Sequence, residues 1–302
     1  MTITNILCPT DFSEASEHAV DLAVAIAAAS HARLAAIHVT RAMPIPSGVG
    51  TPGGYSLDDA EMATLRRKTA ACFSAVSGPG GDVDVFVDEG SPADRILERA
   101  AVLPADLIVM GTHGSRGFER LVLGSVTERV LRRAPCPVLT VPPRAHATSR
   151  LPLRRLLCAI DFSEPSLAAL DYAKSLAIEW DAALTLLHVL EWPWNEPPPP
   201  DFAELPAPQG AALAEYRRYR ETMALAELGA MASASPGTIR LPTTRLRHGK
   251  PYVQILDVAA EEGSDLIVVG VHGRNPIDLS VFGSTTNQIV RRAPCPVLTL
   301  RR

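Results

Sequence analysis

The chain repeats itself, and this internal repeat constrains the fold more than any other feature of the sequence. The segment LCPTDFSE at Leu7–Glu14 returns as LCAIDFSE at Leu157–Glu164, and Arg132–Thr140 returns unchanged as Arg291–Thr299. The spacing between the copies grows from 150 to 159 residues, so the second copy has nine additional residues, which we place in the proline-rich stretch Trp192–Pro208. We therefore predict two homologous domains, 1–145 and 152–302.

Each copy shows the same alternation of apolar strands and helices. Strands are expected at Ile3–Cys8, Arg33–Thr40, Val83–Asp88, Leu107–Met110 and Val138–Val141, and at Arg155–Ala159, Ala183–Leu190, Thr243–Arg247, Leu266–Val269 and Val297–Leu300. Asp11 with Glu14, and Asp161 with Glu164, are typical of the capping box that begins a helix. The pattern predicts an α/β fold with two doubly wound, five-stranded parallel sheets. Ligands of such sheets bind beyond the carboxyl ends of the strands.

Composition excludes several classes of function. Among 302 residues, Lys and Arg number 29 and Asp and Glu 33, a balance of −4 that argues against a dedicated nucleic-acid binder. The most apolar run, Leu22–Ala29, is too short to cross a membrane. Met1–Glu14 lacks the features of a signal peptide. The five cysteines form neither a CxxC motif nor a metal-like spacing, so a cytoplasmic protein without a metal site is expected.

A glycine pattern follows the fourth strand of each copy. It reads Gly111-Thr112-His113-Gly114, nine residues and Gly124-Ser125, and in the second copy Gly270-Val271-His272-Gly273, nine residues and Gly283-Ser284. Glycine lets a backbone approach a ligand closely, and a helix that begins at the serine offers free N–H groups to a phosphate. The hydroxyls of Ser125 and Thr127, and of Ser284 and Thr286, could add donors. The alternative is a tight strand–helix turn with a serine cap.

Polar residues at the same edge could contribute to a binding site. Asp11 and Asp161 follow the first strand and could accept hydrogen bonds from a ribose or a base, or could cap the next helix. His113 and His272 could donate to a phosphate or bond to the backbone. Arg116 could face a phosphate or solvent.

Other motifs do not support a different chemistry. Gly48–Gly53 spells GxGxxG, but it lies in a Pro/Gly-rich loop well after the second strand rather than in a strand–helix turn, so we interpret it as loop. GxxxxGK[ST], GxSxG and HExxH are absent. No catalytic residue is predicted.

Together, these features resemble the universal stress protein family in two tandem copies. The resemblance rests on the segment Pro9–Ser13 with its partner Asp161–Ser163, on both glycine patterns, and on Pro135–Leu139 with its duplicate. It implies the strand order 3-2-1-4-5, adenine-nucleotide binding and dimerisation through the last strand. The residues that it assigns to nucleotide binding in the first copy are Asp11, Val39, Met110, Gly111, His113, Gly114, Gly124, Ser125, Val126 and Thr127. Pro9, Thr10 and Arg116 are further candidates for the same site. In the second copy they are Asp161, Val189, Val269, Gly270, His272, Gly273, Gly283, Ser284, Thr285 and Thr286.

The resemblance favours a stress-response regulatory protein that binds ATP and hydrolyses it at most slowly, with an unidentified regulatory protein as partner. ADP or AMP are alternative ligands, and Mg²⁺ could accompany the phosphates. Two other hypotheses stay open: an enzyme that uses ATP, for example to adenylate a substrate, and a partner-binding scaffold whose glycine loops are relics.

The last strand of each copy predicts how the copies assemble. In the family's strand order it lies at a sheet edge, and an unpaired apolar edge needs a partner. The linker Pro142–Pro152 is long enough for both partners to come from one chain. We expect an intramolecular pseudo-dimer with the two last strands adjacent and antiparallel. A homodimer of the full chain is compatible with this arrangement.

Overall fold

The computed structural model describes residues 3–40, 57–77, 83–112, 123–143, 153–191, 207–234, 241–271 and 283–301. The first half contains β1 (Asn5–Pro9), α1 (Glu14–Ser30), β2 (Arg33–Thr40), α2 (Asp59–Ser77), β3 (Val83–Glu89), α3 (Pro92–Val102), β4 (Leu107–Gly111), α4 (Ser125–Arg133) and β5 (Val138–Val141). The second half contains β6 (Arg155–Ile160), α5 (Glu164–Glu179), β7 (Ala183–Leu190), α6 (Ala207–Ser233), β8 (Thr243–His248), α7 (Pro251–Glu262), β9 (Leu266–Gly270), α8 (Ser284–Arg292) and β10 (Val297–Leu300).

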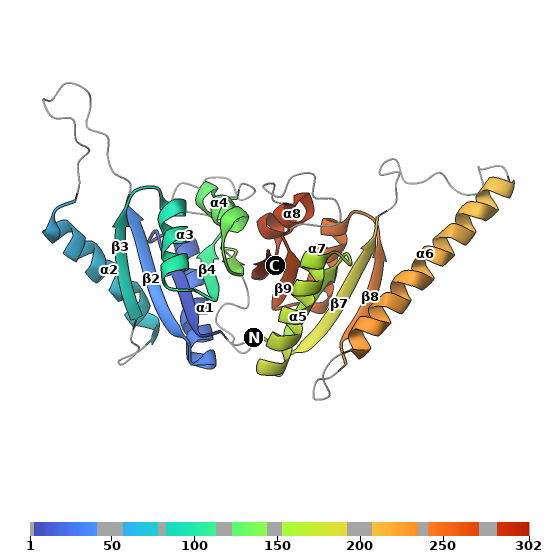
Figure 1. Cartoon of the computed structure of the whole chain (residues 1–302), viewed down its shortest axis with the longest axis horizontal. Helices are drawn as coiled ribbons and strands as arrows, with labels where there is room; N and C mark the ends of the chain where they lie inside the picture. Colours follow the sequence, from blue (N-terminus) through green and yellow to red (C-terminus); the bar gives the residue numbers. More distant parts are fainter. Residues whose placement is uncertain are drawn as a thin grey trace, which may run out of the picture.

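All ten strands form one sheet, in the order β3-β2-β1-β4-β5-β10-β9-β6-β7-β8. Each half has the predicted order 3-2-1-4-5 with parallel strands, so the fold class is confirmed. The two five-stranded sheets are continuous with each other (Figure 1). The limits expected for the two domains stay a prediction, and most of the expected linker lies outside the described residues.

The last strands of the two halves form the seam of this sheet. β5 and β10 pair antiparallel, as predicted, with Thr140 opposite Val297, Leu139 opposite Leu298, and Val138 opposite Thr299. The Thr140 hydroxyl donates to the Val297 carbonyl and the Thr299 hydroxyl to the Val138 carbonyl, both at 3.1 Å. Because these bonds repeat across an approximate two-fold axis, the two halves form a pseudo-dimer.

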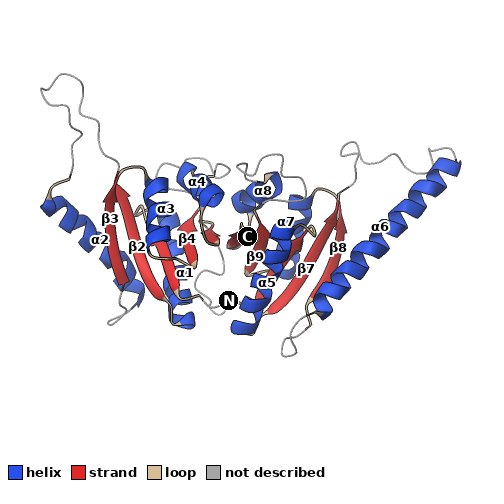
Figure 2. Cartoon of the chain, in the orientation of Figure 1, coloured by secondary structure: helices blue, strands red, loops and turns tan. Residues whose placement is uncertain are grey.

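Helices cover both faces of the sheet (Figure 2). Buried side chains of α1, α2, α5 and α6 belong to one core, and those of α3, α4, α7 and α8 belong to the other. Both cores contain residues of the two halves, so each runs across the seam. β4 and the matching run of β9 are buried because helices lie on both sides of them. In the described part of the chain, no helix has the length and apolar character needed to cross a membrane.

Two details differ from the sequence prediction. The N-cap residues of the first helix in the two halves are Ser13 and Ser163 rather than Asp11 and Asp161, so the capping-box assignment was wrong. The Ser13 side chain accepts a hydrogen bond from the Ser16 amide, whereas Ser163 makes no such side-chain bond. The nine additional residues were placed in the proline-rich stretch before the second helix of the second half. That helix, α6, has 27 residues and its counterpart α2 only 19, so the helix itself is longer in the second half. Most of the proline-rich stretch lies outside the described residues.

The cysteines pack mainly as small apolar side chains. Cys8, Cys158 and Cys295 are buried, and Cys136 is partly buried. Burial raises the pKa of Cys158 and of Cys295 to about 12, which keeps both thiols protonated at neutral pH.

Candidate functional site

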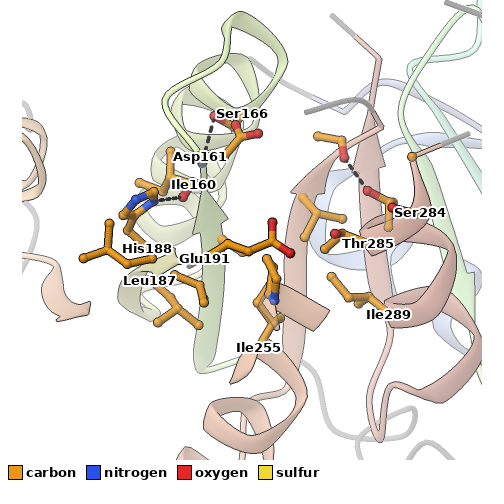
Figure 3. A pocket seen from close by; sticks show the side chains of 18 of the residues that line it. Ile160, Asp161, Ser166, Leu187, His188, Glu191, Ile255, Ser284, Thr285 and Ile289 are labelled. Atoms are coloured by element: carbon orange, nitrogen blue, oxygen red, sulfur yellow. Dashed lines mark hydrogen bonds between the residues drawn. The ribbon is translucent and has the colours of Figure 1, made fainter. Parts of the chain in front are cut away.

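A pocket of about 480 Å³ opens at the carboxyl ends of β6, β7 and β9, beside the start of α8 (Figure 3). It lies where the strand order of the second half reverses, which is the position expected for a ligand in a doubly wound sheet. Its lining comes from segments far apart in sequence: Ala159–Asp161, Ser166, Leu187–Glu191, Arg220, Pro251, Ile255, Val269, Gly270, Gly283–Thr286 and Ile289.

The sequence-predicted residues of the second half converge on this pocket. Every one of them that the structure describes lines it: Asp161, Val189, Val269, Gly270, Gly283, Ser284, Thr285 and Thr286. His272 and Gly273 lie outside the described residues. The structure brings these residues together, and their role in nucleotide binding stays a prediction.

The predicted residues of the first half occupy the matching edge of its sheet. Pro9, Thr10 and Asp11 lie at the end of β1, Val39 in β2, Met110 and Gly111 in β4, and Gly124, Ser125, Val126 and Thr127 at the start of α4. β1 pairs with both β2 and β4, which brings their carboxyl ends side by side. His113, Gly114 and Arg116, and the Gly48–Gly53 motif, lie outside the described residues.

Each aspartate supports the turn that follows its strand. Asp11 Oδ1 accepts hydrogen bonds from the Ser13 amide, at 3.1 Å, and from the Ser13 hydroxyl. Asp161 Oδ1 accepts the same two bonds from Ser163, with the amide at 3.0 Å. Asp161 nevertheless lines the pocket, so one carboxylate both holds the turn and faces the site.

A histidine in the second strand of each half fixes this turn, and the sequence reasoning missed it. His38 Nδ1 lies 2.8 Å from the Thr10 carbonyl, and His188 Nδ1 lies 2.7 Å from the Ile160 carbonyl. A carbonyl only accepts, so Nδ1 carries the proton. Burial lowers the pKa of His38, which favours the neutral ring. The signal was present, because both histidines recur at the same place in the repeat.

An aromatic ring packs on each histidine. Phe12 and Phe162 lie 4.3 and 4.4 Å from the imidazole centroids, and their φ angles of 62° and 64° are in the left-handed region. A phenylalanine adopts this conformation only at a cost, so surrounding contacts must hold it. In each half the histidine thus contacts both neighbours of the aspartate, namely the carbonyl of the residue before it and the phenylalanine ring of the residue after it.

We expect His188→Phe to destabilise the protein by roughly 1–3 kcal/mol, because it leaves the buried Ile160 carbonyl without its donor. His188→Asn is the matched control, since its amide can donate from nearly the position of Nδ1. Chemical denaturation measures both free energies of unfolding. Equal stability of the two variants would contradict the assigned hydrogen bond.

The start of α8 presents free backbone donors to the pocket. Gly283 is the N-cap and provides no side-chain cap, and Ser284 and Thr285 in the first turn line the pocket. The first N–H groups of a helix have no partner within it, and the helix dipole favours a negative charge there. α4 begins in the same way after Gly124. These termini can therefore bind an anion.

Two hydroxyls predicted to face the ligand are used by the fold instead. Thr286 Oγ1 donates to the Gly270 carbonyl at 2.8 Å, and Thr127 Oγ1 donates to the Gly111 carbonyl at 2.9 Å. Each bond ties the start of the helix to the end of the preceding strand. Ser284 and Ser125, the other two hydroxyls predicted to face the ligand, are exposed.

The glycines of the second-half pattern have structural reasons as well. A Cβ atom on Gly283 would lie 2.8 Å from the Val271 carbonyl oxygen, and one on Gly270 would lie 3.0 Å from the Pro165 backbone. Both distances are too short for an ordinary contact. These two glycines therefore allow segments of the protein itself to pack closely, whether or not a ligand is bound.

Two charged side chains of the pocket were not predicted. Figure 3 shows Glu191, directly after β7, extending toward the side of the pocket formed by α8. Arg220 of α6 also lines the pocket, and its Nη1 donates to the Tyr216 hydroxyl at 3.0 Å. Glu191 could have been found, because it follows a strand at the ligand-binding edge. Arg220 could not, because the position of α6 does not follow from periodicity.

Comparisons of sequence identify relatives for both halves. The sequence model of the universal stress protein family matches residues 2–142 and 152–301. A universal stress protein of Methanocaldococcus jannaschii is 38% identical over 137 residues, which are 45% of this chain and 80% of that protein. One of Thermus aquaticus is 38% identical over 138 residues, 45% of this chain and 96% of that protein.

Solved structures resemble the whole chain. A universal stress protein of Archaeoglobus fulgidus has a TM-score of 0.65 at 22% identity, with 99% of this chain and 98% of that chain covered. A putative universal stress protein of Pseudomonas aeruginosa has a TM-score of 0.62 at 18% identity, with coverages of 99% and 93%. At these identities the likeness concerns the fold.

Proposed function

The chain belongs to the universal stress protein family, and from this premise we propose that each half binds an adenine nucleotide, with ATP as the expected ligand. The proposed role is that of a stress-response regulator that hydrolyses ATP at most slowly and acts through a regulatory protein partner. All five cysteines are free thiols, which is compatible with the cytoplasm as its location.

One observation carries the proposal. The described second-half residues that the glycine pattern and the family resemblance assign to nucleotide binding line a single pocket, which has the uncapped start of α8 at one side. Phosphate suits the free N–H groups there, and Asp161 and Glu191 can accept hydrogen bonds from ribose hydroxyls or a base amino group. Apolar contacts from Val189, Val269 and Ile255 suit a flat base.

A magnesium ion would come with the phosphates. Among the described residues, no group of three or more His, Cys, Asp or Glu side chains could hold a metal ion. In the proposed site, the chain's own residues would bind and orient the nucleotide, and Mg²⁺ would neutralise the charge of its phosphates.

The test replaces the first residue of each binding helix. Ser284→Glu and Ser125→Glu place a carboxylate where a phosphate should bind, while an acidic residue in the first turn favours the helix itself. By calorimetry we expect two ATP sites in the unmodified chain, one in each single variant and none in the double variant. Ser233→Glu, at the far end of α6, is the control and should keep both sites.

Two further measurements complete this test. Adenosine should bind the variants as it binds the unmodified chain, because it has no phosphate to be repelled. Mass spectrometry of ligand released from the purified full chain should detect an adenine nucleotide. Unchanged ATP binding in the double variant would contradict the proposal.

A further inference from the structure

Helix α6 carries an apolar stripe that faces away from the sheet. Tyr216, Tyr219 and Met223 are 48, 59 and 44% exposed, and Ala226, Ala230 and Ser233 continue the stripe as exposed residues. The spacing alternates between three and four residues, which is the pattern of a coiled-coil seam. We call these six residues the α6 stripe.

The opposite side of α6 already has its partner. Ala224, Leu228 and Ala232 are buried, and the helix packs on β7 and β8. Figure 1 shows α6 at the outer side of the second half, running past the ends of these two strands. The α6 stripe is therefore not needed to hold the helix on its own sheet, and half-exposed tyrosines grouped on one line indicate an interaction surface.

The side chains of the α6 stripe are complementary in size to those of a second α6 stripe that runs antiparallel to it. The large residues lie in its first half and the small ones in its second half. An antiparallel pair can place Tyr216 against Ser233, Tyr219 against Ala230 and Met223 against Ala226, each contact occurring twice. In this register, large side chains meet small ones at every level, as in a coiled coil that packs knobs into holes.

Charge agrees with the same register. Arg220 and Glu227 occupy the same flank of the α6 stripe, seven residues apart. In the antiparallel pair, Arg220 of one copy lies beside Glu227 of the other, and the pair forms twice. In a parallel pair, each of these two residues would face the opposite flank of the partner's stripe, so the Arg220–Glu227 pair would not form.

We propose that the α6 stripe is a homodimer interface, in which α6 of one chain packs antiparallel on α6 of a second copy. The contact is isologous, because the same surface serves on both chains, so it closes after two copies. It is small, so the dimer should dissociate on dilution.

Sedimentation of the full chain tests the proposal. We expect a shift with rising concentration from 32.3 kDa to twice that mass. Tyr219→Glu should abolish the shift. Leu225→Glu is the control, because Leu225 is 50% exposed on a different side of α6 and should leave the shift unchanged.

A residue swap tests the register. Ala230→Tyr alone places tyrosine against tyrosine and should weaken the dimer at least tenfold. Adding Tyr219→Ala restores a large–small contact and should recover the dimer. A monomeric unmodified chain at high micromolar concentration, a dimer that Tyr219→Glu does not affect, or a swap without recovery would each overturn the proposal.

Discussion

Residues 1–145 produced alone are expected to sediment as a dimer at micromolar concentration. In the full chain β5 pairs with β10, and removal of the second half exposes four buried residues at an open sheet edge. A second β5 can replace β10, because Val138-Leu139-Thr140 is identical to Val297-Leu298-Thr299. Two β5 strands can therefore pair in the observed register, with Leu139 opposite Leu139 and both threonine hydroxyl bonds reformed.

The control for this fragment is Leu139→Arg, which places two cations opposite each other at the centre of the new pair. This variant should sediment as a monomer. A monomeric unmodified fragment that is folded by circular dichroism would show that the β5 edge does not associate on its own.

Gly283→Ala is expected to destabilise the full chain by about 1–3 kcal/mol and to remove nucleotide binding from the second pocket. The added Cβ would lie 2.8 Å from the Val271 carbonyl oxygen, so the start of α8 must move away from β9. The free N–H groups would move with it. Chemical denaturation measures the first effect and calorimetry the second.

Gly229→Ala in α6 is the matched control, and we expect it to change the free energy of unfolding in the opposite direction. A Cβ there meets no atom within 4 Å, and alanine is favoured over glycine inside a helix by about 0.5–1 kcal/mol. We expect this variant to be stabilised and to bind nucleotide normally. Equal effects of the two substitutions would show that glycine at 283 is not needed for close approach.

Much of the fold follows from the sequence because the repeat and the apolar strands act together. β4 and β9 are recognisable as strands buried on both faces, and the pairing of the last strands follows from their apolar character and their edge position in the family's strand order. The spacing of apolar residues does not specify the backbone conformation of a turn. The aspartate could therefore be taken for the helix cap, although Ser13 and Ser163 fill that place.

The candidate site was predictable to the extent that it is made of strand ends. Asp161, Val189 and Val269 follow from strand order, because the carboxyl ends of neighbouring parallel strands meet at one edge. Which hydroxyls face a ligand was not predictable, since the orientation of Thr286 depends on the distance between α8 and the Gly270 carbonyl. Arg220 could not be predicted as a pocket residue either, because the position of α6 depends on how the helix packs.

The β5–β10 seam has a further consequence for how the two halves can evolve. In a dimer of separate identical chains, one mutation alters both sites at once, and dilution parts the subunits. Here both partners are parts of one polypeptide, at an effective concentration of roughly millimolar order, so they stay together on dilution. Each half also has its own stretch of sequence, so one half can acquire a substitution that the other does not. Glu191 lines the second pocket, whereas the residue 150 positions earlier is Arg41. Because the two copies are separately encoded parts of one chain, side chains of opposite charge can occupy corresponding positions of the repeat.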